Sequence, residues 1–434
     1  MNTTARQSSD ETEHCPMSQP ARQSNIDALV RFFESGIKPH GSHGKLGIEL
    51  EQIVVRNDNS PVSYSEEHGV AWLLSQLSES YPEKTVDSEG DLLGVARRGE
   101  AITIEPAAQV ELSAGPFDTL EHASKVFSAY ENTLQNLLAQ NGMCIVAQGY
   151  HPSATARSLE LIPKQRYDFM NRYLNAKDSY GPCYGPCMMR GSASTQISID
   201  YTSVDDCLRK MRLAYALVPL LSLICDNSPM FEGKPRTHKL MRTDVWRHTD
   251  RDRCGLVPGA LNKDFTLERY AQFVLDTPAI VMPQDGGWAY SEKTFGEIYA
   301  NQTMTSQEIE HAVSMQFPDV RLKTYLEIRP ADSMPIPYVI AYAALIKGLF
   351  YSENSLDALD TLFEGVTAES FEAAKDDLMQ HGYDAVVYGK PAAELCDSIM
   401  GIALKALSAE DATYLEPLMQ LVQNRTTLAD IAES

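Results

Sequence analysis

The sequence has little positive charge and no long apolar run. Its 37 lysines and arginines stand against 59 aspartates and glutamates, which gives a formal net charge of −22 at pH 7. Nucleic acids and anionic membranes are bound through basic surfaces, so we predict that neither is a partner of this protein. No apolar run reaches the roughly 18 residues that a membrane-spanning helix needs. The longest run, residues 214–225, is typical of a buried helix.

The first 25 residues also lack an apolar segment. Residues 1–25 are polar, which favours a disordered tail over a secretory signal. The eight cysteines lie mostly within apolar patterns, as free thiols do in a reducing compartment, and we expect a cytoplasmic location. Cys183 and Cys187 each follow a Gly-Pro step. No further ligands at zinc-site spacing accompany them, so a redox pair and loop thiols without a function both remain open.

What the sequence does contain is a set of strands with acidic or amide side chains on one face. Residues 101–116 alternate apolar and polar on either side of an interruption at 106–108. Such alternation predicts strands that bury one face. Three more stretches, 47–51, 195–200 and 325–329, share the pattern. The polar faces carry Glu49, Glu51, Thr103, Glu105, Gln109, Glu111, Gln196, Ser198, Asp200, Tyr325, Glu327 and Arg329.

Four such strands predict one sheet whose open face gathers carboxylates. Like charges on one face repel each other unless cations lie between them. Hard oxygen ligands on rigid strands suit Mg²⁺. We therefore expect a magnesium site on this face of the sheet.

Apolar residues at helical spacing predict most of the remaining elements. Helices are expected at residues 26–35, 65–81, 117–141, 165–173, 203–226 (with a kink at Pro219), 265–275 and 306–315, and strands at 144–148 and 279–282. Residues 178–191 and 227–255 are predicted as loops, the second one functional because of its length. From about residue 336 to residue 434 the pattern is nearly all helical. No repeat or linker divides the chain, so we predict one domain over residues 26–434.

Eight motifs follow one another along the chain. They are G-I-E-L-E (47–51), I-T-I-E-P-A-A-Q-V-E-L-S (102–113), I-P-K-Q-R-Y (162–167), T-Q-I-S-I-D-Y (195–201), N-S-P-M-F-E-G-K-P (227–235), M-R-T-D-V-W (241–246), D-R-D-R-C-G (250–255) and F-P-D-V-R-L-K-T-Y-L-E-I-R (317–329). In this order they resemble glutamate–cysteine ligases of the type found in plants and many bacteria. The ergothioneine-pathway enzyme with the same activity is close kin. The resemblance covers about residues 44–351.

This resemblance implies a fold and a reaction. The fold is α+β and like that of glutamine synthetase, with a curved antiparallel sheet that forms a funnel and helices packed outside. The reaction joins L-glutamate to L-cysteine with ATP, giving γ-glutamylcysteine, ADP and phosphate. The implied cofactor is Mg²⁺, two or three ions, and the implied partners are small-molecule substrates. We expect a monomer or a homodimer whose product serves glutathione or ergothioneine synthesis.

The resemblance also assigns roles to individual residues. By motif match the metal ligands are Glu49, Glu51, Glu105, Glu111, Gln196 and Glu327. An arginine fork suits the α-carboxylate of glutamate, and Arg242 is the better match, with Arg247 and Arg253 in the same loop. Arg329 shares a strand face with Glu327 and would offset phosphate charge. Arg190 lies one position further from Gln196 than the family pattern has it, which leaves open whether it binds substrate.

Three alternatives remain open at the level of sequence. The first is a ligase of the same class with another amine acceptor, because no residue of the sequence identifies a pocket for the cysteine thiol. The second is a non-catalytic binding protein that keeps the fold, although none of the acidic ligands is missing. The third is a phosphotransferase of the guanidino-kinase type, which would release no phosphate on addition of an amine.

Overall fold

An open antiparallel sheet lies at the centre of the computed structural model, which describes residues 19–39, 41–42, 44–87, 89–176, 182–284 and 287–433. Its strands lie in the order β14 (Val320–Leu322), β15 (Leu326–Asp332), β7 (Ser194–Ile199), β1 (Leu46–Arg56), β5 (Val110–Phe117), β4 (Glu100–Ile104), β3 (Leu92–Arg97) and β2 (Glu83–Val86). A ninth strand, β6 (Met143–Val146), pairs with the second half of β1. The predicted α+β class with an antiparallel sheet is confirmed, and β14 and β2 form the edges of a sheet that is not closed.

The central strand β1 shows how sequence alternation builds the two faces of this sheet. Leu46, Ile48 and Leu50 are buried, whereas Glu49 and Glu51 point to the opposite face. The other acidic stretches fall on β4 with β5, on β7 and on β15, all within the same sheet. The prediction that one sheet face gathers these residues is therefore confirmed.

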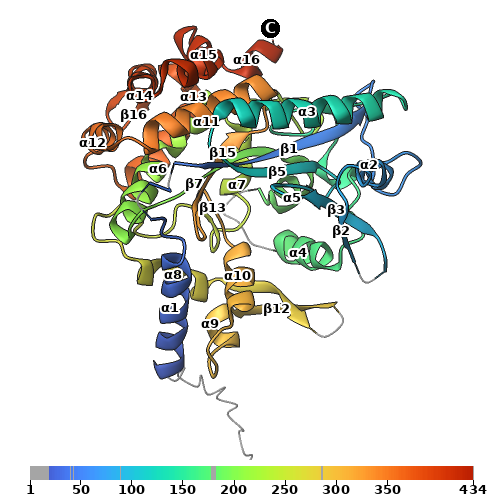
Figure 1. Cartoon of the computed structure of the whole chain (residues 1–434), viewed down its shortest axis with the longest axis horizontal. Coiled ribbons are helices and arrows are strands. Elements are labelled where there is room, and N and C mark those ends of the chain that lie inside the picture. The colour runs from blue at the N-terminus through green and yellow to red at the C-terminus, as the bar shows by residue number, and fades with distance from the viewer. Residues whose placement is uncertain are drawn as a thin grey trace, which may run out of the picture.

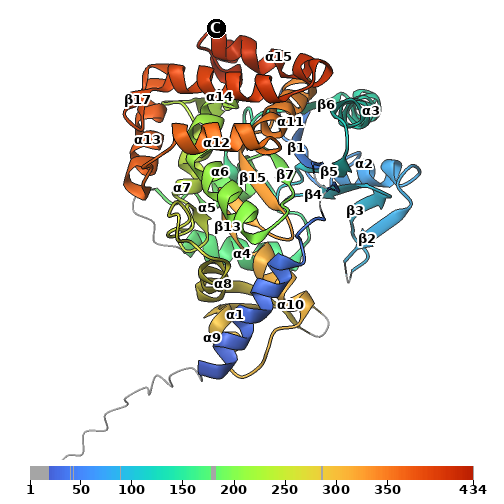
Figure 2. The same ribbon diagram turned by 60° about the vertical axis from the view of Figure 1, so that its left-hand side comes forward.

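Two long helices cover the apolar face. α3 (Leu120–Ala139) and α11 (Ile336–Phe350) lie across the sheet, and α11 contacts β1 and β7 (Figure 1). The α3 helix begins after Thr119, whose side chain accepts a hydrogen bond from the backbone N–H of His122. α11 is apolar almost all around because α12 (Glu353–Leu362), α14 (Ala392–Ala406) and α15 (Ala409–Gln423) pack on its other side (Figure 2).

The remaining elements surround this centre. α6 (Val204–Ile224) packs on β15, and α13 (Ala368–His381) packs on α6. α4 (Gln165–Ala176) lies on the opposite side of the sheet from α3 and α11 in both views (Figures 1 and 2). Below it in both figures are α1 (Gln19–Glu34), α8 (Leu267–Asp276), α9 (Phe295–Ile298), α10 (Ser306–Ser314) and the hairpin of β11 (Pro278–Gln284) and β12 (Gly287–Thr294).

Several predicted boundaries are wrong. α1 begins at Gln19, so residues 19–25 are helical rather than a tail, while residues 1–18 lie outside the described part of the chain. The helix predicted at 65–81 is only α2 (Val70–Leu77). The predicted loops hold short elements: α5 (Gly185–Gly191), α7 (Met241–Arg247), and the two-residue strands β8 (Met230–Phe231), β9 (Lys234–Pro235) and β10 (Cys254–Gly255). Seven-residue helices are too short to show a helical period in sequence.

Three features complete the fold. β10 pairs in parallel with β13 (Phe317–Pro318), and β16 (Val386–Val387) pairs with β17 (Lys390–Pro391). The last described helix is α16 (Leu428–Glu433). No helix in the described residues is long and apolar enough to cross a membrane.

Candidate active site

The acidic face of the sheet forms one wall of a cavity of about 310 Å³, here called the acid pocket. Its other walls come from α4, α5, α7 and the region around β13 and β14. The pocket is lined by Glu49, Glu51, Thr103, Glu105, Gln109, Glu111, Lys164, Arg166, Tyr167, Met170, Met188, Met189, Ser192, Gln196, Trp246, Ser314, Phe317, Arg321 and Arg329, among others. Five of the six predicted metal ligands thus line one cavity.

Strand pairing places the carboxylates next to one another. Glu51 on β1 lies directly opposite Glu111 on β5, and Glu49 lies opposite Gln196 on β7. Glu111 accepts hydrogen bonds from Ser113 Oγ at 2.8 Å and from Thr103 Oγ1 at 3.3 Å. Like charges directly opposite each other in a sheet are destabilising, so this pairing points to a positively charged ligand.

The ionisation of these carboxyl groups is shifted accordingly. Burial and the neighbouring carboxylates Glu327 and Glu111 raise the pKa of Glu49 to about 8. Burial together with Glu105 and Glu111 raises the pKa of Glu51 to about 8, and burial with Glu105 raises the pKa of Glu111 to about 7. In Glu49 and Glu51 the effects of burial and of neighbouring carboxylates exceed the opposing effect of nearby arginine and lysine side chains.

Glu327 is the opposite case. Burial alone would raise its pKa, but Arg321, Lys323 and Arg329 hold the pKa of Glu327 well below its usual range. Its carboxylate accepts from Arg321 Nε and Arg329 Nη1 at 2.6 Å each, and from Lys323 Nζ at 2.8 Å. The side chain is fully buried. Glu327 therefore anchors a group of cations, here called the cationic wall, beside the four other glutamates on the same face of the sheet.

Gln196 connects the acidic and the cationic side. Its Oε1 accepts a hydrogen bond from Arg329 Nη1, and its Nε2 donates to Glu51 Oε1 at 3.3 Å. The backbone N–H of Ser194 donates to Glu51 Oε2 at 2.7 Å. β7 thus holds the Glu51 carboxylate in place through both of its oxygens.

The donor set fits a divalent cation. Glu49, Glu51, Glu105 and Glu111 form no ion pair with lysine or arginine within the described residues. Nor do the residues described here contain three or more His, Cys, Asp or Glu side chains grouped closely enough to hold a metal alone. Mg²⁺ is commonly bound by one or two carboxylates, with water and phosphate oxygens as the other ligands. The facing pair Glu51 and Glu111 meets that requirement.

A second cavity of about 470 Å³ adjoins the acid pocket and shares Glu49 with it. Its lining includes the cationic side chains Lys38, Lys45 and Arg97, together with apolar wall residues such as Ile48. Lys45 pairs with Asp118 at 3.1 Å and Arg97 with Glu100 at 2.7 Å. The second cavity is thus partly apolar and mixed in charge, because Glu49, Glu100 and Asp200 also line it.

Two of the five predicted substrate-binding or catalytic arginines lie at this site. Arg329 lines the acid pocket. Arg242 is buried just behind it, where Nη1 donates to the carbonyl oxygens of Arg329 at 3.1 Å and Pro330 at 3.4 Å. Its guanidinium carbon lies 5.4 Å from the centre of the Trp246 ring, and its buried Nε has no hydrogen-bond partner. A small adjoining cavity is lined by Arg242, Trp246 and Arg329.

The other predicted arginines do not line the pocket. Arg253 is fully buried and donates to Asp250 Oδ2 and to two backbone carbonyls. Arg247 pairs with Glu372 and Asp376 on α13. Arg190 donates to the Leu159 carbonyl at 3.0 Å and to Asn171 Oδ1 at 2.7 Å. None of the three lines the acid pocket, and each is engaged by the partners named here; their substrate-binding roles stay predictions.

Sequence reasoning missed several pocket residues. Arg321, Lys164, Arg166 and Trp246 all line the acid pocket. Arg321 lies opposite Glu327 in the β14–β15 pairing, which a sequence pattern does not reveal. A usable signal was present for Lys164 and Arg166, because both lie in the motif I-P-K-Q-R-Y.

Cys183 and Cys187 are free thiols. Burial raises the pKa of Cys187 to about 12, which suppresses the thiolate that redox exchange needs. Cys183 is exposed, and its Sγ lies 3.2 Å from the Leu174 carbonyl oxygen. The structure therefore favours thiols without a redox function.

Known proteins share this sequence pattern. The family model described as glutamate–cysteine ligase family 2 (GCS2) matches residues 45–431. The chain is 28% identical to the chloroplastic glutamate–cysteine ligase B of Oryza sativa subsp. japonica over 358 residues, which cover 79% of this chain and 70% of the rice protein. It is 26% identical to the chloroplastic glutamate–cysteine ligase of Arabidopsis thaliana over 414 residues, covering 93% of this chain and 78% of that protein.

Among solved structures, the chain matches one in the complex between the prokaryotic ubiquitin-like protein Pup and its ligase PafA. The TM-score is 0.39 at 10% identity, and the match covers 90% of this chain and 65% of that one. The family model spans nearly the whole described chain, from the start of β1 to α16. This chain therefore belongs to glutamate–cysteine ligase family 2.

Proposed function

We propose that this protein joins the γ-carboxylate of L-glutamate to the amine of L-cysteine while ATP is converted to ADP and phosphate. The observation that supports this function is the acid pocket, which four glutamates line together with Arg321 and Arg329. Phosphorylation of a carboxylate brings two anions together, and catalysis depends on positioning and charge neutralisation. A pocket with both acidic side chains that can bind cations and the cationic wall suits that task.

The proposed reaction has two steps. An oxygen of the glutamate γ-carboxylate attacks the γ-phosphorus of ATP, and ADP leaves. The cysteine amine then attacks the carbonyl carbon of the γ-glutamyl phosphate, loses a proton, and phosphate leaves as the amide forms. Arg329 and Arg321, both held by Glu327, would donate hydrogen bonds to the phosphoryl oxygens.

Two or three Mg²⁺ ions are proposed on the acidic wall. Their ligands would be Glu49, Glu51, Glu105, Glu111 and Gln196, and magnesium there would neutralise charge on the phosphate oxygens. Glu327 was predicted as a sixth ligand. Because its carboxylate already accepts from three cations, we propose that it orients the cationic wall.

Arg242 is the proposed partner of the glutamate α-carboxylate. It lies at the end of the acid pocket beside Trp246, and its buried Nε is unpaired in the described structure. A guanidinium fork binds a carboxylate through two parallel hydrogen bonds. The nucleotide would then occupy the second cavity, where Lys38, Lys45 and Arg97 are candidates to bind its phosphates.

One observation bears on the amine acceptor. The acid pocket is lined by three methionines, Met170, Met188 and Met189. Soft, polarisable thioethers form an adaptable wall that suits a thiol side chain. This favours cysteine over an acceptor with a charged or larger polar side chain. A cytoplasmic location, the monomer or homodimer, and product use in glutathione or ergothioneine synthesis stay predictions.

The test is release of phosphate from Mg-ATP and L-glutamate, with and without L-cysteine and with other amino acids in its place. We expect a large cysteine-dependent rate, with γ-glutamylcysteine identified by mass. Release with another amine alone would keep the mechanism and reject cysteine as the acceptor. No release with any acceptor from folded protein would favour the binding-protein alternative, and phosphorylated product without free phosphate would favour the phosphotransferase.

A further inference from the structure

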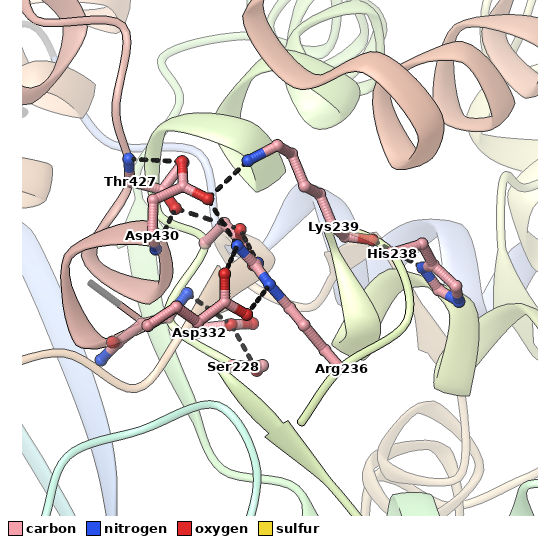
Figure 3. Close-up of polar contacts among 10 residues, drawn as sticks. Ser228, Arg236, His238, Lys239, Asp332, Thr427 and Asp430 are labelled. Atoms are coloured by element: carbon pink, nitrogen blue, oxygen red, sulfur yellow. Dashed lines mark hydrogen bonds and ion pairs between the residues drawn. The ribbon is translucent and has the colours of Figure 1, made fainter. Parts of the chain in front are cut away.

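A cluster of ion pairs ties α16 to the segment that leads into α7 (Figure 3). Its centre is Arg236, whose side chain is only 4% exposed. The guanidinium donates to Asp226 at 2.5 Å, to Asp430 at 2.6 Å and to Glu433 at 2.7 Å. Lys239 Nζ adds a bond of 2.5 Å to Asp430 Oδ1. Two cations thus hold three carboxylates, two of which lie on α16.

Further hydrogen bonds hold the start of α16 against Asp226. The Thr427 hydroxyl, which is buried, donates to Asp226 Oδ2 at 3.2 Å and accepts from the Asp430 N–H at 3.1 Å. The Ala429 N–H donates to the Asp226 carbonyl oxygen at 3.2 Å. Asp226 is therefore contacted by α16 through its side chain and its backbone at once.

The residues after Asp226 connect the ion-pair cluster to the end of β15 through hydrogen bonds. The hydroxyl of Ser228 donates to Asp332 Oδ2 at 2.6 Å (Figure 3). The N–H of Asn227 donates to the same oxygen at 2.8 Å. Asn227 Nδ2 also donates to the Ser333 carbonyl oxygen at 2.9 Å. Asp332 ends β15, the strand that carries Glu327 and Arg329. The segment held by α16 thus supports the cationic wall of the acid pocket.

The residues after Lys239 connect the ion-pair cluster to α7. Leu240 has a left-handed backbone (φ 56°), and no side chain caps the first turn of α7. Residues 236–240 thus lead directly into this helix, which also packs on α5 and β10. α7 supplies Arg242 and Trp246, and Arg242 donates to the backbone of β15 at Arg329.

We propose that α16 positions the active site. In this proposal, the ion pairs of Arg236 with α16 fix residues 226–239, and these residues in turn fix the end of β15 and the start of α7. Arg236, Asp430 and Glu433 touch no reacting atom, so they are positioning residues. Removal of the guanidinium leaves Asp226 buried without its charge partner, and such a charge draws water and loosens the segment around it. The expected functional effect rests on the ligase activity proposed above.

The test compares Arg236→Met and the milder Glu433→Gln with a matched control, Arg425→Met. Arg425 also forms a two-bonded pair near α16, with Asp397 at 2.7 and 2.6 Å, but that pair is about half exposed and does not contact residues 226–239. We expect Arg236→Met to lower kcat/KM for glutamate about tenfold while the KM for ATP changes less than about twofold. Amide hydrogen exchange should quicken across residues 226–247 in Arg236→Met, less so in Glu433→Gln, and not in the control.

Arg236→Lys keeps the charge and loses the fork, so it should fall between wild type and Arg236→Met. Unchanged amide hydrogen exchange across residues 226–247 in Arg236→Met would overturn the inference. So would an equal loss of kcat/KM for glutamate and for ATP that parallels the drop in melting temperature across the variants. If Arg236→Met does not fold, Glu433→Gln and Arg236→Lys carry the same comparison. An inactive wild type would reject the proposed function, whereas the exchange comparison would still decide the positioning role.

Discussion

The residues of the acid pocket differ in charge state because of their neighbours rather than their type. Glu327 is buried among three cations, and its pKa is far below the usual range despite that burial. Glu51 is buried among acids, and burial with Glu105 and Glu111 raises its pKa to about 8. The two side chains are chemically identical, so their positions in the sheet explain why Glu327 pairs with arginines and Glu51 is suited to bind a metal cation.

Glu327→Gln is expected to inactivate the enzyme. Arg321, Lys323 and Arg329 would lose their common counter-ion, so kcat should fall about a hundredfold or more. Breaking a buried ion pair from one side costs about 3–5 kcal/mol of stability. Steady-state kinetics well below the melting temperature measures the first effect and denaturant unfolding the second. Glu364→Gln removes an exposed carboxylate that does not line the acid pocket and should change neither. Full activity of Glu327→Gln would contradict the proposed cationic wall.

His151 is expected to make stability depend on pH. Its Nδ1 accepts from the N–H groups of Ser153 and Ala154, and burial lowers the pKa of His151 to about 4. An unfolded histidine has a pKa of about 6.5, so the unfolded state binds the proton first as pH falls. Stability should therefore drop between pH 6.5 and pH 4, by up to about 3 kcal/mol.

Denaturant unfolding from pH 4 to pH 7 measures this loss. His151→Asn should be less stable than wild type at pH 7 and should show a flatter pH profile. A profile with the same slope in both proteins would show that other groups cause the acid sensitivity.

Sequence patterns predicted the acidic residues of the pocket better than its arginines. Alternation along a strand shows which face Glu49 and Glu51 share, and that is a local property. Whether an arginine reaches a pocket depends on partners elsewhere: Arg247 is held by Glu372 and Asp376, more than a hundred residues away. For Arg253 the partner Asp250 is only three residues away, a spacing that could have indicated a local pair.

At the scale of elements, α4 depends on the β11–β12 hairpin for its position. The N–H of Trp288 donates to Gln165 Oε1 at 3.1 Å, and the Arg166 guanidinium lies 5.4 Å from the centre of the Trp288 ring. Further along α4, Arg172 lies 4.4 Å from the centre of the Tyr290 ring. Because Lys164, Arg166 and Tyr167 line the acid pocket, the hairpin indirectly shapes the active site.

Trp288→Ala is expected to weaken catalysis without unfolding the protein. The loss of one cation–π contact, about 0.5–1 kcal/mol, should loosen Arg166 and lower kcat/KM about three- to tenfold. Trp72→Ala on α2 is the control, because Trp72 does not line the acid pocket. Equal kinetic losses in both variants would mean that the hairpin has no specific role.

The same scale shows what a sequence pattern can and cannot predict about the fold. Strands β1, β4, β5, β7 and β15 and helix α3 were predicted because each has enough residues to display its period. Strands β2, β3 and β14 were not predicted: every residue of β2 is exposed, and β14 has only three residues. α5 and α7 were missed because each has seven residues. β12 was missed because it lies in a two-stranded hairpin with no strongly buried face, so its alternation is weak.

At the scale of the whole molecule, the net charge of −22 has a local counterpart in the acid pocket. Mg²⁺ should therefore stabilise the protein, by about 2.7 kcal/mol at a hundredfold excess over its Kd. The raised pKa values of Glu49 and Glu51 mean that metal-free stability falls as pH rises from about 4.5 to 8. The stabilisation by Mg²⁺ should thus be larger at pH 8 than at pH 6.

Thermal unfolding with and without EDTA measures this effect. Sodium chloride at matched ionic strength is the control, since screening alone acts on all exposed charges. Glu51→Gln should stabilise the metal-free protein and shrink the magnesium effect. An equal shift with sodium chloride would show that no specific cation site exists.

The Ser333 hydroxyl donates a hydrogen bond to the Glu51 carbonyl oxygen, and the large sequence separation of the two residues has a consequence for biosynthesis. These residues are 282 positions apart in the chain. During translation the strands with the acidic side chains leave the ribosome first, and β14 and β15 with their arginines follow much later. Until then the nascent sheet has mutually repelling carboxylates and an unpaired edge at β7, so it is exposed to proteases and to chaperones. The centre of this enzyme is thus completed late, by one of the last strands to be synthesised.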